Sequence, residues 1–123
     1  MIGTMAKYFL GFLSVSCILC ANPQNPIVTG GAARFDAAEK VLKIFAENKA
    51  RIDWSSFSIE KDETTCFVLP DSASVVINRV VGAEVSCLFG ILQSNGKIVL
   101  INRNGIWIGP DAKIDVGGLV AST

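Results

Sequence analysis

The chain of 123 residues contains no histidine, and its formal net charge is zero. Without histidine it lacks the commonest general base of enzymes and the commonest transition-metal ligand in proteins. Eleven basic residues balance eleven acidic ones, so no long-range field favours nucleic acid or an anionic membrane surface. These absences disfavour histidine-dependent catalysis and nucleic-acid binding, and we expect neither a metal nor a cofactor.

Charged residues are also few, at 18% of the chain, whereas 50% of the residues are apolar. Disordered chains show the opposite balance, so the composition predicts a folded protein. The length suits one small domain.

The C-terminal third, residues 85–123, contains short apolar runs separated by turn sequences. Each run suits one β-strand and is too short for a stable helix. The pairs Asn95-Gly96 and Asn104-Gly105 are strong turn signals. The runs are residues 88–92, 98–101, 106–108 and 114–116.

Further upstream, residues 52–59 alternate between apolar and polar, which predicts a strand with Trp54 and Phe57 buried. Turn signals recur about every nine to twelve residues, as in all-β folds of many short strands. A parallel β-helix and a β-sandwich both fit this spacing. In a β-helix, the side chains suited to point inward are Ile98, Leu100, Ile106, Ile108, Ile114 and Val116.

Residues 36–49 are ambiguous. Val41, Leu42 and Phe45 have helical spacing among good helix formers. A period of two instead places Leu42, Ile44 and Ala46 on one side, as in a strand. Local pattern alone favours the helix by a small margin.

The N-terminal 21 residues are typical of a secretory signal peptide. Lys7 gives a positive start, residues 8–19 form an apolar stretch too short to span a bilayer, and Ala21 suits the position before cleavage. A membrane anchor is the alternative; after cleavage we expect no stable membrane span. The segment 22–33 is rich in Pro, Gly and Asn, which predicts an extended entry into the fold.

The sequence GILQSNGKIVLINRNGIWIGPDAKIDVGGLVAST, which ends at Thr123, closely resembles the N-terminal domain of filamentous haemagglutinin, the two-partner secretion (TPS) domain. The likeness extends upstream to residues 52–59 and 75–82. The family's Asn-Pro-Asn-Gly turn corresponds to Asn102, Arg103, Asn104 and Gly105, so the proline is replaced by arginine. Changes to this motif impair secretion in the family, which makes these four residues the candidate site for transporter recognition or for the turn itself.

The resemblance implies a right-handed parallel β-helix of the pectin-lyase-like kind, with N-terminal capping strands, over residues 22–123. It implies strand rather than helix at 36–49, and a domain cut to about half the family's length. The implied function is the N-terminal secretion domain of a large, adhesin-like exported protein of a Gram-negative bacterium, secreted or held at the cell surface and not an enzyme. The implied partners are the Sec machinery in the inner membrane and an outer-membrane β-barrel transporter with periplasmic recognition domains.

Two other functions stay open. Polysaccharide lyases also use parallel β-helices, and Asp111, Lys113 and Asp115 form the one compact group of suitable charges, although a solvent-facing row of charges is the simpler interpretation. A nonfunctional structural remnant is the second alternative.

Cys66 and Cys87 are the cysteines that remain after signal-peptide cleavage. They are spaced by about one coil of a solenoid, so stacking of neighbouring coils could bring them within disulfide range in an oxidising compartment. Two buried thiols that act as small hydrophobic groups are the equal alternative. The acidic loop at residues 60–65 is expected to be solvated rather than to bind a cation.

Overall fold

The computed structural model describes residues 22–123, and within that range it contains β-strands and no helix. The predicted signal peptide, residues 1–21, lies outside the described residues. No helix in the described range is long and apolar enough to cross a membrane. The strands are β1 (Ile27–Gly30), β2 (Ala33–Ala37), β3 (Val41–Ala46), β4 (Ala50–Trp54), β5 (Thr64–Val68), β6 (Val75–Val80), β7 (Ser86–Leu88), β8 (Ile91–Ser94), β9 (Lys97–Ile101), β10 (Ile106–Ile108), β11 (Lys113–Asp115) and β12 (Gly118–Ser122).

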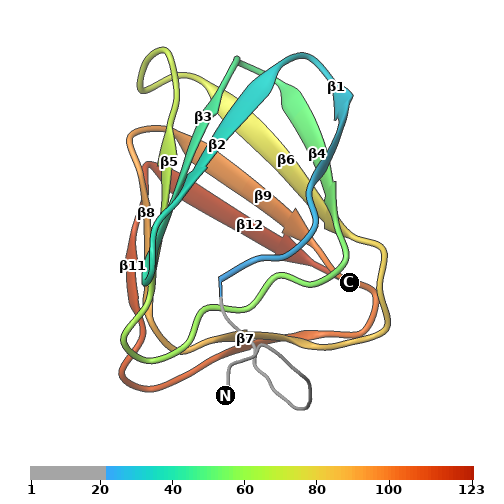
Figure 1. Ribbon diagram of the computed structural model, residues 1–123, viewed down its shortest axis with the longest axis vertical. Coiled ribbons are helices and arrows are strands. Elements are labelled where there is room, and N and C mark those ends of the chain that lie inside the picture. Colours follow the sequence, from blue (N-terminus) through green and yellow to red (C-terminus); the bar gives the residue numbers. More distant parts are fainter. Residues whose placement is uncertain (1–21) are drawn as a thin grey trace, which may run out of the picture.

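The strands form a parallel β-solenoid of about four turns, which confirms the β-helix over the β-sandwich (Figure 1). One face stacks β3, β5, β8 and β11, and a second stacks β4, β6, β9 and β12. A short third face pairs β7 with β10. All these stacked pairs are parallel, and each coil contributes one strand to each of the two long faces, whereas the third face has β7 and β10 alone among the described residues.

Two antiparallel strands cover the first coil. β1 pairs with β4, and β2 pairs with β3, in agreement with the expected capping strands. The ambiguous segment 36–49 forms the end of β2, a tight turn closed by the amide of Ala38 donating to the carbonyl of Val41 at 2.8 Å, and strand β3. Strand is therefore confirmed there, because the side chains with a period of two point into the core.

The interior of the solenoid is a continuous apolar stack. Register places Ala50 beside Val76, and Val76 beside Ile98 in the next coil. All three side chains are fully buried. Trp54 and Phe57 are buried as predicted, with their rings 5.5 Å apart in an edge-to-face arrangement.

The predicted strand at 88–92 is wrong in detail, because the chain turns a corner at Phe89-Gly90 between β7 and β8. The corner presses directly on the coil beneath it. A Cβ on Gly90 would lie 2.1 Å from the carbonyl oxygen of Glu60 and 2.4 Å from that of Glu63, distances that no side chain tolerates. Glycine at position 90 therefore permits a sharp bend within an otherwise continuous apolar run.

Most of the predicted inward positions are confirmed. Ile98 and Leu100 are fully buried, and Ile106, Ile114 and Val116 are partly buried against the core. Ile108 differs, since 47% of it is exposed. Its strand β10 pairs on one side with β7 and belongs to the last coil of that face, so within the described residues no further strand covers it.

Candidate functional site

The motif Asn102-Arg103-Asn104-Gly105 forms the corner that joins β9 to β10. The amide of Gly105 donates to the carbonyl of Asn102 at 3.0 Å and closes a tight turn. Gly105 has a φ of 111°, a conformation that side-chain-bearing residues rarely adopt. The sequence thus supplies glycine at the one position of the corner where the backbone requires it.

Asn102 is fully buried, and its side chain holds the corner together from the inside. Its Nδ2 donates to the carbonyl of Glu84 and to the hydroxyl of Ser86, each at 2.9 Å. Its Oδ1 accepts from the amide of Asn104 at 2.9 Å and from Asn104 Nδ2 at 3.0 Å. Both ends of the amide are therefore bonded within the protein, and neither faces solvent.

Asn104 ties this corner to the corner of the preceding coil. Its Nδ2 also donates to the carbonyl of Gly82 at 2.8 Å. The amide of Ser86 donates to the carbonyl of Gly105 at 3.0 Å and adds a backbone link between the same two coils. Asn102 and Asn104 together therefore set the stacking of one coil corner on the next.

Arg103 is the exposed member of the motif. Two other exposed side chains lie beside the motif in sequence or space: Trp107, on β10 after Gly105, is 60% exposed, and Val85 is 44% exposed with a methyl group 4.0 Å from the Cβ position of Gly105. Trp107 is a surface residue that sequence reasoning missed. Its position between Ile106 and Ile108, with strand alternation, is the signal that places it on the outer surface.

The cysteines are both free and partly buried, and they lie in different sheets, Cys66 in β5 and Cys87 in β7. Register pairs Cys66 with Gln93 and Cys87 with Trp107. The stacking on which the disulfide prediction depended is absent, because the two residues occupy different faces of the solenoid rather than neighbouring coils of one face.

The acidic residues do not converge on one site. Asp111 lines a surface depression with Phe89 and Pro110, whereas Asp115 lines another with Cys66 and Gln93. Among residues 22–123 no three acidic or cysteine side chains are grouped as a metal site would require. The geometry offers no support for the lyase alternative.

The acidic loop differs from its predicted solvated state at Glu63, which is only 8% exposed. Its Oε1 accepts a hydrogen bond from the amide of Glu60 at 2.9 Å, so the side chain folds back under the loop. Burial raises the pKa of Glu63 above its usual value of 4.5. Lys40 and Asp62 form an exposed ion pair beside it.

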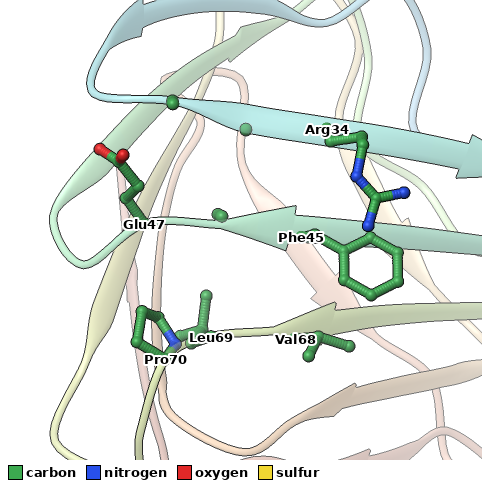
Figure 2. Close-up of a pocket in the computed structure, with 9 residues that line it drawn as sticks. Arg34, Phe45, Glu47, Val68, Leu69 and Pro70 are labelled. Carbon is green, nitrogen blue, oxygen red and sulfur yellow. The ribbon is translucent and has the colours of Figure 1, made fainter.

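A shallow groove crosses the outer face of β2, β3 and β5 (Figure 2). The guanidinium carbon of Arg34 lies 4.1 Å from the centre of the Phe45 ring, and Val68 and Glu47 also line the groove. It belongs to a different sheet from β9, the strand that leads into the motif corner, so the groove and the corner are separate features.

These elements define a class of protein, the parallel β-solenoid whose coil corners are fixed by hydrogen bonds from asparagine side chains. The family model for the TPS secretion domain matches residues 27–123, and the chain belongs to that family.

Known proteins of Haemophilus influenzae are similar to this chain. A heme/hemopexin-binding protein is 41% identical over 86 residues, which cover 70% of this chain and 9% of that protein. The protein of the same name from strain Rd is 38% identical over 102 residues, which cover 82% of this chain and 11% of that protein. The crystal structure of the HMW1 secretion domain superposes with a TM-score of 0.80 at 38% identity, over 81% of this chain and 27% of that one.

The chain thus spans about a tenth of the length of the curated relatives it matches. It is a secretion domain of an exported protein, secreted or displayed at the surface of a Gram-negative bacterium. Membership of the family implies a cognate outer-membrane transporter as its partner.

Proposed function

We propose that residues 1–21 direct the chain to the Sec machinery and that the domain, still unfolded, is recognised by the periplasmic domains of its transporter. An extended segment would add a strand to a sheet edge of the partner, a common mode of peptide recognition. The protein of which this domain is part then folds outside the cell. The domain acts by being recognised and by folding, not by catalysis.

The observation that carries this proposal is the internal bonding of Asn102. Every hydrogen-bonding group of its side chain is bonded to the chain's own corner or to the coil before it. In the folded domain, Asn102 therefore has no free hydrogen-bonding group for a transporter. We propose that the motif supports secretion mainly through folding, with Arg103 as the member that is free to contact a partner.

The parallel topology supports folding after passage. Thr64 of β5 lies beside Ile91 of β8, and Lys113 of β11 also lies beside Ile91. Each coil therefore completes its hydrogen bonds only when the chain of the next coil has arrived, so these contacts are non-local and form slowly. A domain of this kind can stay unfolded during transit and gain its stability on the far side.

The experiment is co-expression of the chain with a candidate cognate transporter of the two-partner secretion family, in a Gram-negative host that lacks other such transporters. We expect the chain in the medium or at the surface when the transporter is present, and in the periplasm when it is absent. Equal export with and without the transporter would overturn the proposal. A chain that stays in the periplasm with a functional transporter would favour the remnant alternative.

A further inference from the structure

The two Asn-Gly pairs of the chain, at residues 95–96 and 104–105, are chemically reactive as well as turn-forming. In a flexible chain, the backbone nitrogen of the glycine attacks the side-chain carbonyl carbon of the asparagine and closes a succinimide ring. Water then opens the ring to aspartate or isoaspartate. Glycine favours the attack because its backbone is adaptable and no side chain shields its nitrogen. Both pairs are therefore sites where an unfolded chain can deamidate.

In the folded domain, hydrogen bonds hold the first pair away from this reaction. Nδ2 of Asn95 donates to the carbonyl of Leu69 in the preceding coil, and Oδ1 accepts from the amide of Leu69, each at 2.8 Å. The amide of Gly96, which would attack, donates instead to the hydroxyl of Ser94 at 3.0 Å. Gly96 is also buried, and the carbonyl oxygen of Ser74 lies 2.7 Å from where its Cβ would be. Ring closure at Asn95 must therefore first break the bonds to Leu69.

The second pair is held in the same way at the next corner. Nδ2 of Asn104 donates to the carbonyl of Gly82 at 2.8 Å and to Oδ1 of Asn102 at 3.0 Å. The amide of Gly105 donates to the carbonyl of Asn102 at 3.0 Å. At both corners, the attacking nitrogen and the side chain under attack are thus bonded to other groups of the fold.

Deamidation would damage the corner at which it occurs. In both corners the side-chain nitrogen is a donor to the preceding coil, to Leu69 in one case and to Gly82 in the other. A carboxylate has no such donor and would set a negative oxygen against a carbonyl oxygen. Isoaspartate also lengthens the backbone by one methylene, which shifts the strand that follows, β9 or β10, against its neighbour in the preceding coil.

We propose that Asn95 and Asn104 are deamidation sites that react when the domain is unfolded, are protected when it is folded, and destabilise the fold once modified. The bond from the glycine nitrogen to Cγ forms as the bond from Cγ to Nδ2 breaks, and the glycine amide proton leaves with the ammonia. Hydrolysis of the ring consumes one water, so no other reactant is needed. A chain kept unfolded therefore loses folding competence with time, whereas a folded chain keeps both corners. The inference goes beyond the proposed function, and its tests involve no transporter.

The first test compares the purified chain with a synthetic peptide of residues 91–108 in the same mildly alkaline buffer. The peptide contains both Asn-Gly pairs but lacks the preceding coils that hold them. Peptide mapping by mass spectrometry follows each site, and isoaspartate methyltransferase labels the rearranged product. Because the folded chain must open locally before it can react, we expect deamidation at both sites to be at least about tenfold slower in the chain than in the peptide. Equal rates at either site would overturn the protection there.

The second test asks whether the product destabilises the fold. Asn95→Asp and Asn104→Asp each replace the bonded donor by a carboxylate, and both should unfold at a lower urea concentration than the parent. Asn48→Asp is the matched control: Asn48 is exposed, and its Oδ1 accepts from the amide of Val75 at 3.0 Å. A carboxylate keeps that acceptor, so the same change of charge should leave the midpoint unchanged. If the variants at 95 and 104 unfold at the same urea concentration as the variant at 48, deamidation does not harm the fold and this part of the proposal is wrong.

Discussion

Replacing Asn102 by alanine tests the corner motif most severely. The side chain is fully buried and takes part in four hydrogen bonds, two through its amide nitrogen and two through its oxygen. A net contribution of about 0.5–1.5 kcal/mol for each bond gives a loss of about 2–6 kcal/mol. Rotation of the Ser86 hydroxyl to another partner would reduce this figure, so we expect a loss of about 2–4 kcal/mol.

That loss is large beside the total stability of a small domain, which is about 5–15 kcal/mol. Urea unfolding of the processed chain, followed by tryptophan fluorescence, measures it directly, because Trp54 is buried in the core. Asn102→Ala should lower the midpoint without changing the slope of the transition. A change in the free energy of unfolding below about 0.5 kcal/mol, the lower limit for a single bond, would refute the assignment of Asn102 as the internal support of the corner.

Three further substitutions probe neighbouring features. Gly105→Val should cost about 1–3 kcal/mol through backbone strain alone, since φ is 111° and no atom crowds the Cβ position; an unchanged urea midpoint would contradict this. Arg103→Pro should be neutral or stabilise by up to about 1 kcal/mol, because proline restricts the unfolded chain, and a lowered midpoint would show that the corner cannot accept it. Glu63→Gln tests the buried carboxyl. The pKa of Glu63 is raised in the folded state above its usual value of 4.5, so the folded state binds the proton more tightly than the unfolded state does. Stability should therefore fall as the pH rises from 4.5 through the folded-state pKa. The glutamine variant keeps an acceptor for the Glu60 amide, and its free energy of unfolding should fall less over that pH range. If variant and parent show the same pH profile, Glu63 does not cause the fall in stability.

Much of the fold can be predicted from the sequence because its physical signals are local. Ile98 and Leu100 alternate with polar or outward residues, and Asn-Gly pairs mark the breaks. The sequence could not show that Asn95-Gly96 is a corner between strands of two different sheets rather than the turn of a β-hairpin. Both breaks are corners, fixed from the neighbouring coil: Asn95 bonds the amide and carbonyl of Leu69, each at 2.8 Å.

The details that the local sequence pattern missed share one cause: in a solenoid, the burial of a residue depends on the coil above or below it. Gly90 bends an apolar run because carbonyl groups of the preceding coil lie against it. The side chain of Glu63 is buried where it folds back to the amide of Glu60, and its carbonyl accepts from the amide of Ile91 in the next coil. The local pattern at residues 36–49 favoured a helix, yet pairing of β3 with β2 and β5 decides for strand.

The candidate motif was identified from resemblance, and its residues do lie together at one corner. The sequence could not show whether a partner recognises this turn or whether the turn serves only to fold the domain. The bonding of Asn102 separates these two roles for one residue, while Arg103 stays available at the surface.

The most direct test compares secretion with stability for two asparagine corners. Asn95→Ala removes the side-chain bonds of a corner outside the turn Asn102–Gly105, and Asn102→Ala removes those of that turn. Secretion by the cognate transporter is measured beside the refolding rate and the free energy of unfolding of each variant. If the motif acts through folding, both variants lose secretion in proportion to their loss of stability and folding rate. If Asn102→Ala folds like the parent yet is not secreted, while Asn95→Ala is secreted, the transporter recognises the motif directly and its proposed role in folding is wrong.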